Sequence, residues 1–435
     1  MNRPRVVIAG GGFGGLAAAQ ALHAAPVDVL LIDRSNHHLF QPLLYQVATS
    51  VLSPGQIASP IRNILRKQRN AEVLFGEVTG IDKDSRRIFA KNVDREGVAI
   101  TYDHLILATG AHHSYFGHDE FAQFAPGLKT AADAVMIRNR ILQAFERAEA
   151  LENPKAQDGL LTFVLVGAGA TGVEMAGAIA VLVRQTLRSE FRRIDPATAH
   201  VVLIEGGGRV LPGFSEPLSQ AAHRRLESLG VEIRAGRVDR IDPDGAWIGS
   251  DRIPSKTVIW TAGVIASPAG KWLGVETDKA GRVKIDGMLR VPGHPEVFVI
   301  GDAAALDQDG KPLPGVAQVA MQQGRYAAKY IAGLIAGRPQ PRPFRYFDKG
   351  SMAVVGKGYA VMESGKFKLK GLPAWMAWAV IHIRYLAQSG LRISVFLQWM
   401  WTFLTGQRGS RLILDYHAEK ADEANYLPDR ATGRS

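Results

Sequence analysis

Two glycine-rich segments that repeat one another constrain the fold of this chain more than any other feature. Residues 5–15 read RVVIAGGGFGG and residues 163–174 read FVLVGAGATGVE, each an apolar β-branched run that leads into an Ala-rich stretch. Both carry the GxGxxG spacing, with Gly10, Gly12 and Gly15 in the first copy and Gly167, Gly169 and Gly172 in the second. These glycines permit a tight strand-to-helix turn and a close backbone approach to a pyrophosphate at the helix N-terminus. We therefore expect an α/β fold with two Rossmann-like domains, each binding a dinucleotide.

An acidic residue ends the strand predicted after each motif. Asp33 closes VLLID, and Glu205 closes VVLIE after a longer interval that we interpret as an extended helix plus a loop. A carboxylate at this position accepts hydrogen bonds from ribose hydroxyls. One nucleotide normally stays bound while the other exchanges, so a flavin plus a nicotinamide is the simplest pair. Glu205 favours NADH because a carboxylate repels the 2′-phosphate of NADPH, although Arg209 nearby leaves NADPH open.

A third segment, EVFVIGDAAAL, extends the first nucleotide domain. Asp302 follows its strand and is either a helix N-cap or the carboxylate that accepts from flavin hydroxyls. The second interpretation makes the flavin domain discontinuous, with the nicotinamide domain inserted. We accordingly predict an FAD domain at 1–115 and 286–345, an NADH domain at 116–285, and a C-terminal membrane-anchoring and dimerisation region at 346–435.

Composition excludes several kinds of chemistry. The 435 residues include no cysteine, so disulfides, thiolate metal sites and a redox dithiol are absent and redox chemistry requires a bound cofactor. The 12 histidines show no helical spacing typical of a zinc hydrolase, and we expect no metal site. The net charge of +11 favours an anionic partner such as a membrane surface or a nucleotide.

The chain resembles the type II NADH:quinone oxidoreductases, respiratory flavoproteins that do not pump protons. The resemblance covers nearly the whole chain. It rests on NHHLFQPLLYQVATSVLSPGQIASPIR (36–62), ATGVE around Glu174, TAGV (261–264) and PLPGVAQVAMQQG (312–324). Related flavoenzymes that act through cysteines beside the flavin are disfavoured, because this chain has none. The resemblance implies that NADH reduces FAD and that two electrons then pass to menaquinone or ubiquinone.

The resemblance also assigns residues to roles. For FAD it implies Gly10, Gly12, Phe13, Gly14, Gly15, Asp33, Thr109, Gly110 and Asp302, and for NADH it implies Gly167, Gly169, Thr171, Gly172, Glu205 and the Gly263 of TAGV. Glu174 is placed in the first helical turn near the reacting rings, where the alternative role is a favourable interaction with the helix dipole. Gln318 and Gln322 share one face of a predicted helix and suit a quinone, because an amide both donates and accepts. The alternative is a polar face turned to solvent.

The C-terminal region has the composition of a membrane surface segment. Residues 364–411 contain seven basic residues, no acid, and four of the seven tryptophans, which we expect at headgroup depth. Its two apolar stretches are too short to span a bilayer. We expect peripheral, monotopic attachment to anionic lipid on the cytoplasmic face of the inner (plasma) membrane, and a homodimer. A dimer interface or core segment is the alternative, and the polar tail after His417 is expected to be disordered.

Two other functions remain open at this stage. A soluble NAD(P)H oxidase or ferredoxin-type reductase would use the same two nucleotide motifs, but the basic aromatic C-terminal region argues against it. A sensor that binds FAD and NADH without fast turnover, its positive charge meeting nucleic acid, is the other. We expect no nucleic-acid partner.

Overall fold

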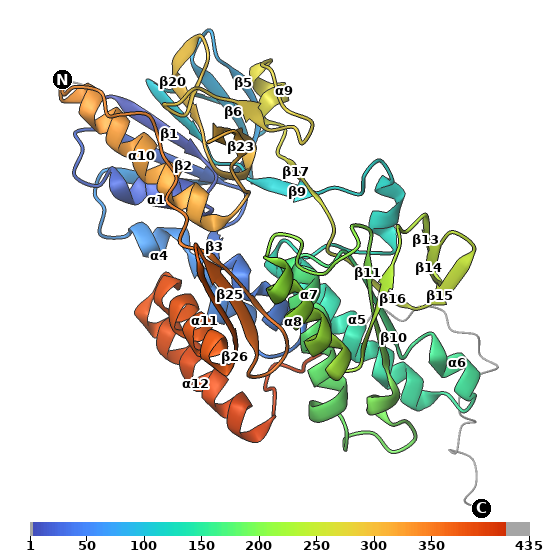
Figure 1. Cartoon of the computed structure of the whole chain (residues 1–435). Coiled ribbons are helices and arrows are strands. Elements are labelled where there is room, and N and C mark those ends of the chain that lie inside the picture. The colour runs from blue at the N-terminus through green and yellow to red at the C-terminus, as the bar shows by residue number, and fades with distance from the viewer. Residues whose placement is uncertain (1–2, 415–435) are drawn as a thin grey trace, which may run out of the picture. The chain divides into compact units, whose positions relative to one another are not determined.

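The chain forms two compact units in a computed structural model that describes residues 3–414 (Figure 1). Unit 1 contains residues 3–39, 58–113 and 264–349, and unit 2 contains residues 40–57, 114–263 and 350–414. Unit 1 is therefore interrupted by the second nucleotide motif, which confirms a discontinuous first domain. The exact domain boundaries given above stay a prediction.

The main sheet of unit 1 has parallel strands in the order β5, β2, β1, β8, β20, which is a doubly wound arrangement with β1 at its centre. Antiparallel β6 and β7 extend one edge and β19 the other. The strands are β1 (Arg5–Ala9), β2 (Asp28–Asp33), β3 (His37–Leu39), β4 (Ala58–Pro60), β5 (Ala71–Asp82), β6 (Arg87–Asn92), β7 (Val98–Thr101), β8 (His104–Leu107), β9 (Ala111–His113), β17 (Val264–Ala266), β18 (Val283–Lys284), β19 (Arg290–Val291), β20 (His294–Val299), β21 (Ala304–Ala305), β22 (Asp307–Gln308) and β23 (Lys311–Pro312).

Two helices of unit 1 pack unusually closely against one another. The helices of this unit are α1 (Phe13–Ala21), α4 (Ile61–Leu65), α9 (Ala269–Leu273) and α10 (Ala317–Ile335). A Cβ atom on Gly324 of α10 would lie 2.2 Å from the carbonyl oxygen of Gly14 on α1. Both glycines are therefore needed for α10 to reach α1, where buried Leu16, Ala328 and Ile331 join the core.

The main sheet of unit 2 repeats the plan of unit 1. Its parallel strands follow the order β12, β11, β10, β16, and the first of them in sequence, β10, is again central. The strands of the unit are β10 (Thr162–Val166), β11 (His200–Glu205), β12 (Val231–Ala235), β13 (Arg240–Asp242), β14 (Gly245–Ile248), β15 (Asp251–Pro254), β16 (Thr257–Trp260), β24 (Ser351–Val354), β25 (Ala360–Ser364) and β26 (Phe367–Gly371). The predicted α/β fold with two Rossmann-like domains is thus confirmed.

Helices of unit 2 come from all three of its segments. They are α2 (Leu44–Ala48), α3 (Pro54–Ile57), α5 (Ala131–Ala150), α6 (Pro154–Asp158), α7 (Ala170–Val181), α8 (Glu216–Ser228), α11 (Leu372–Tyr385) and α12 (Ser389–Thr405). A π-helical turn, Leu182–Thr186, prolongs α7, and a loop from 187 to 199 follows it, so that both lengthen the interval before Glu205. Short 3₁₀ turns occur at Gln41–Leu43, Asp119–Gln123, Pro196–Thr198 and, in unit 1, Gly301–Ala303.

The C-terminal part of unit 2 is an antiparallel sheet with two helices. The strands β24, β25 and β26 pair in sequence order, and α11 and α12 follow them as the red helices of Figure 1. Gly177 of α7 lies close to this sheet, because a Cβ there would be 2.7 Å from the Gly356 nitrogen. Among residues 3–414, no helix is long and apolar enough to cross a bilayer. The tail predicted to be disordered lies outside the described residues.

Candidate functional site

The first glycine motif forms a tight turn that connects β1 to α1 in unit 1. Gly10 has φ +106°, and its Cβ position lies only 2.3 Å from the Ala108 carbonyl oxygen. A Cβ on Gly15 would lie 1.8 Å from the Gly10 oxygen, so helix and turn are in direct backbone contact. Gly12, the N-cap of α1, has no atom within 4 Å of its Cβ position. The helix N-terminus therefore faces open space of the kind a pyrophosphate requires.

The second motif reproduces this turn between β10 and α7 in unit 2. Gly167 has φ +103°, and a Cβ on Gly172 would lie 1.9 Å from its carbonyl oxygen. Gly169, the N-cap of α7, again has nothing within 4 Å of its Cβ position. Both turns thus leave the helix N-terminus accessible at the second glycine of the motif. In both, the first and third glycines have no room for a Cβ atom.

The acids at the strand ends are held in the same way in both units. Asp33 accepts from the Gly11 N–H at 2.5 Å through one carboxylate oxygen and from the Ser35 N–H at 2.5 Å through the other. Glu205 accepts from the Ala168 N–H at 2.8 Å and from the Gly207 N–H. Each carboxylate is therefore fixed beside the residue that follows the first glycine, where a nucleotide ribose would lie. The two turns and acids together fit a dinucleotide in each unit.

The other residues predicted to contact FAD make the following contacts in unit 1. Thr109 Oγ1 is 2.5 Å from Ser267 Oγ, and the Gly110 carbonyl accepts from the Ser267 N–H at 3.0 Å. Phe13 packs edge-on against His38 with ring centroids 5.0 Å apart. Asp302 lies in the 3₁₀ turn that follows β20.

Gly14 allows α1 to pack closely against α10 in this structure. Its Cβ position lies 3.0 Å from Ile300 Cδ1 and 3.2 Å from the Ala320 carbonyl oxygen, so it faces α10. Of the remaining positions predicted for NADH, Thr171 is exposed on the first turn of α7, and Gly263 has φ +70° with its Cβ position 2.4 Å from the Phe116 ring.

Glu174 lies one turn inside α7 and is largely shielded from water. The prediction that it belongs to the first helical turn is wrong, because α7 begins at Ala170 and has no acid in its first turn. Its carboxylate accepts from the Val354 N–H at 3.3 Å. Burial raises the pKa of Glu174 to about 8, with the Val354 hydrogen bond opposing the shift. The side chain is thus a protonated acid at neutral pH, which suits proton delivery.

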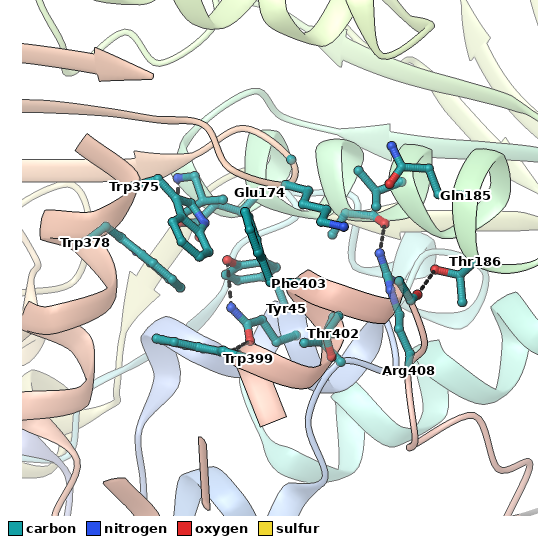
Figure 2. A pocket seen from close by; sticks show the side chains of 18 residues that line it. Tyr45, Glu174, Gln185, Thr186, Trp375, Trp378, Trp399, Thr402, Phe403 and Arg408 are labelled. Atoms are coloured by element: carbon teal, nitrogen blue, oxygen red, sulfur yellow. Dashed lines mark hydrogen bonds between the residues drawn. The ribbon is translucent and has the colours of Figure 1, made fainter. Parts of the chain in front are cut away.

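Glu174 lines an aromatic pocket whose lining residues all belong to unit 2 (Figure 2). Three of the four C-terminal tryptophans line it, namely Trp375, Trp378 and Trp399. Trp378 is 1% exposed and Trp399 is 8% exposed, so the prediction of headgroup contact is wrong for these two. Trp401 alone of the four is mainly exposed. These tryptophans instead form apolar walls of the pocket.

Arg408 brings a buried positive charge to the same pocket. Its Nη1 donates to the Thr49 carbonyl at 2.6 Å and its Nη2 to the Ala178 carbonyl at 3.1 Å. Among the described residues no carboxylate pairs with it. Burial lowers the pKa of Arg408 to about 9, and the neighbouring charge of Arg411 acts in the same direction. The pocket therefore combines a protonated acid, an arginine and aromatic rings.

Several pocket residues were not identified from the sequence. Tyr45 and Gln46 lie within the segment that carried the family resemblance, but no role could be assigned to them because their contacts come from α12, far away in the chain. Arg408 was counted only as one of the basic residues of the C-terminal region.

The two glutamines predicted to bind quinone lie on α10 of unit 1. Gln322 Nε2 donates to the Phe347 carbonyl at 2.9 Å, and its Oε1 accepts from the Phe347 N–H at 3.0 Å. Gln318 is one turn earlier on the same helix, and both side chains are half-buried. The amide of Gln322 thus holds the backbone of Phe347 in this structure, and quinone contact by either glutamine stays a prediction.

Comparison with known proteins identifies relatives over nearly the whole chain. Residues 4–324 match the pyridine nucleotide-disulphide oxidoreductase family. The chain is 48% identical to the type II NADH:quinone oxidoreductase Ndh of Mycobacterium tuberculosis, over 96% of this chain and 92% of that protein. It is 46% identical to NdhA of the same organism, over 95% and 90%. The structure of NDH2 from Plasmodium falciparum in complex with NADH superposes with a TM-score of 0.85 at 20% identity, covering 95% of this chain and 100% of that one.

Proposed function

Because the chain belongs to the type II NADH:quinone oxidoreductases, within the pyridine nucleotide-disulphide oxidoreductase family, we propose that it oxidises NADH and reduces a membrane quinone without pumping protons. The observation that carries the proposal most directly is the duplicated nucleotide turn. Each unit has a helix N-terminus with an open N-cap glycine and an acid fixed beside it. One such site serves a resident cofactor and the other an exchanging substrate.

The residues of each unit divide between the two nucleotides. In unit 1, Gly10, Gly12, Gly15 and Asp33 would hold the pyrophosphate and ribose of FAD, and Gly167, Gly169, Gly172 and Glu205 of unit 2 would hold NADH. When bound, the flavin supplies the two-electron redox chemistry that no side chain of this cysteine-free protein can perform. The protein contributes binding, orientation and a protonated acid.

Proton supply is the chemistry that this chain itself provides. Reducing a quinone to a quinol consumes two protons, and Glu174 holds one at neutral pH because its carboxyl is shielded from water. We include Gln318 and Gln322 as candidate quinone contacts on the strength of the family resemblance. The hydrogen bonds between Gln322 and Phe347 would have to open for Gln322 to take that role.

Steady-state oxidation of NADH tests the proposed function. The purified, FAD-loaded protein is mixed with NADH under air, with and without a short-chain ubiquinone or menadione. We expect consumption of NADH to require the quinone and to be matched by quinol formation. An equal rate with oxygen alone would instead support an NADH oxidase.

Glu205 sets the expected preference for NADH over NADPH. Its fixed carboxylate can accept from a ribose hydroxyl and repels a 2′-phosphate. Glu205→Gln is expected to raise the KM for NADH about tenfold and to reduce the NADH-to-NADPH ratio of kcat/KM. The control is Arg209→Gln, because Arg209 donates to the Pro212 carbonyl at 2.7 Å and the Phe214 carbonyl at 3.0 Å and so is engaged with backbone. A ratio that changes only in the Arg209 variant would contradict this assignment.

An exposed apolar surface on α11 and α12 supports attachment to a membrane. We call it the apolar face, and it comprises Leu372, Met376 and Val380 on α11 and Ile393, Phe396, Leu397, Met400, Trp401 and Leu404 on α12. Val380 is 69% exposed and Leu404 is 74% exposed. Basic residues stand beside these helices in the chain, since Lys366 and Lys368 precede α11 and Arg384 lies in its last turn. Such a surface suits the interface of an anionic bilayer, and we place it at the cytoplasmic leaflet.

Adding charge to the apolar face tests this attachment. Val380→Asp combined with Leu404→Asp is expected to reduce co-sedimentation with phosphatidylglycerol-containing vesicles at least tenfold, because two carboxylates oppose both burial and lipid charge. Leu334→Asp, at a 47% exposed position on α10, is the matched control and should bind like the wild type. Unchanged vesicle binding with loss of a dimer in sedimentation analysis would show that a second copy covers the face instead.

A further inference from the structure

A hydrogen-bonded relay in unit 2 fixes the orientation of one hydroxyl in the aromatic pocket (Figure 2). Trp399 Nε1 donates to Gln46 Oε1 at 2.7 Å, and Gln46 Nε2 donates to the Tyr45 hydroxyl oxygen at 3.1 Å. An indole N–H can only donate, so it determines which end of the Gln46 amide is the oxygen. The other end must then be the NH₂ group that faces Tyr45.

This arrangement leaves the Tyr45 hydroxyl with a hydrogen to donate. Its oxygen already accepts from Gln46, and among the described residues its O–H makes no hydrogen bond of its own. Tyr45 is 5% exposed and lines the pocket. A buried donor without an acceptor is unfavourable, so a ligand oxygen that accepts this hydrogen bond would be stabilised in the pocket.

The charges around Tyr45 keep its proton in place. Burial raises the pKa of Tyr45 well above 10, and the nearby Glu174 carboxyl acts in the same direction. Gln46 and the positive charge of Arg408 oppose this shift without reversing it. The hydroxyl therefore acts as a hydrogen-bond donor and does not lose its proton at neutral pH.

The walls of the pocket suit a flat apolar ring. Trp378 and Trp399 stack with centroids 4.9 Å apart, and Trp375 stacks on Phe403 at 5.4 Å. Rings stacked at these distances leave no room for a third ring between them, so a ligand ring would pack against their outer faces and edges, in the pocket that Tyr45, Glu174 and Arg408 also line. A quinone headgroup has this combination of a flat ring and a carbonyl acceptor.

We propose that the Tyr45 hydroxyl donates a hydrogen bond to a carbonyl oxygen of the quinone headgroup in this pocket, with Gln46 and Trp399 as positioning residues that aim it. The proposal rests on the proposed function and names a catalytic residue for it. The hydrogen bond polarises the carbonyl and stabilises the negative charge that builds on the oxygen as electrons arrive. No covalent bond of Tyr45 is broken.

Removing the hydroxyl is the first arm of the test. Tyr45→Phe is expected to lower kcat/KM for menadione and for a short-chain ubiquinone about tenfold, the effect of one lost hydrogen bond to a developing charge. Reduction of ferricyanide by NADH, which needs no carbonyl donor, should be unchanged. Tyr102→Phe is the matched control, because its buried hydroxyl in unit 1 has no hydrogen-bond partner. An equal loss with both acceptors would show a structural defect and overturn the proposal.

The relay is tested by combining variants. Trp399→Phe keeps an aromatic ring but removes the N–H that orients Gln46, so quinone reduction should fall about threefold. The double variant Tyr45→Phe/Trp399→Phe should be no slower than Tyr45→Phe alone, because the relay acts only through that hydroxyl. Additive effects of the two substitutions would overturn the positioning role.

Binding measurements separate this proposal from the proposed function. Quenching of fluorescence by menadione reports ligand binding, since tryptophans line the pocket. If the wild-type protein binds menadione more tightly than Tyr45→Phe but never reduces it, the site stands and the proposed function fails. Equal binding by wild type and Tyr45→Phe, with equal turnover, would overturn the Tyr45 assignment.

Discussion

Replacing Gly169 by alanine is expected to lower kcat/KM for NADH about 100-fold without unfolding the protein. The N-cap backbone of Gly169 is already in an extended conformation that alanine adopts, and nothing lies within 4 Å of its Cβ position. The added methyl group would instead occupy the space where the pyrophosphate meets the helix N-terminus. Misplacing a bound substrate by about 1 Å can reduce its reaction by about 100-fold. Steady-state kinetics with NADH and ferricyanide, together with the melting temperature and FAD content, measure this effect.

Two neighbouring glycines provide the controls for Gly169→Ala. Gly172→Ala should lower the melting temperature markedly, because its Cβ would lie 1.9 Å from the Gly167 oxygen and force the turn apart. Gly159→Ala, also in unit 2 with nothing within 4 Å of its Cβ position, should change neither kinetics nor melting. A wild-type KM for NADH in Gly169→Ala would show that the pyrophosphate does not lie at this helix N-terminus.

Replacing Glu174 by glutamine is expected to stabilise the fold increasingly as pH rises from 5 to 8. Burial raises the pKa of Glu174 from 4.5 to about 8. Below pH 4.5 the carboxyl is protonated in the folded and the unfolded chain alike. Between pH 4.5 and 8 only the unfolded chain releases the proton, so the stability of the wild type falls with pH. Glutamine carries no such proton, so the variant should gain on the order of 4 kcal/mol by pH 8.

The measurement is the difference in melting temperature between Glu174→Gln and wild type at pH 5, 6, 7 and 8. Glu149→Gln is a control for which the opposite sign of the melting-temperature difference is expected. Its carboxylate accepts from the N–H groups of Arg192, Arg193 and Ile194, and the pKa of Glu149 is lowered because these hydrogen bonds outweigh its desolvation. That variant should be less stable than wild type above pH 5. A difference for Glu174→Gln that stays constant with pH would show that this carboxyl titrates as an ordinary glutamate.

The sequence predicted the structure best where the conformation depends on residues close together in the chain. The two turns depend on glycines at fixed spacing, because each needs one positive φ and one backbone contact closer than a Cβ allows, and both turns formed as predicted. The α/β order followed from the same motifs and from the apolar strands around them. The return of the chain to unit 1 after the second motif also followed, because the third strand end, at Asp302, repeats the position of a nucleotide acid, whereas the placement of residues 40–57 in unit 2 was not predicted.

The aromatic pocket could not be predicted in the same way. Composition alone placed the C-terminal tryptophans at a membrane surface, whereas Trp378 and Trp399 point into unit 2 and only Trp401 is mainly exposed. Which face of a helix is buried depends on its partner. Here α12 meets residues more than 300 positions away, as in the Trp399 to Gln46 hydrogen bond. The buried charge of Arg408 depends on carbonyl groups from two other segments and has no local signature.

Anaerobic mixing in two steps tests the central claim most directly. The FAD-loaded protein is first mixed with NADH while the visible absorbance band of the flavin is followed, and menadione is then added. We predict rapid bleaching with NADH and rapid recovery of the band on addition of the quinone. Bleaching without recovery would contradict quinone reduction while leaving both nucleotide sites intact, and the absence of bleaching would contradict the assignment of NADH to unit 2.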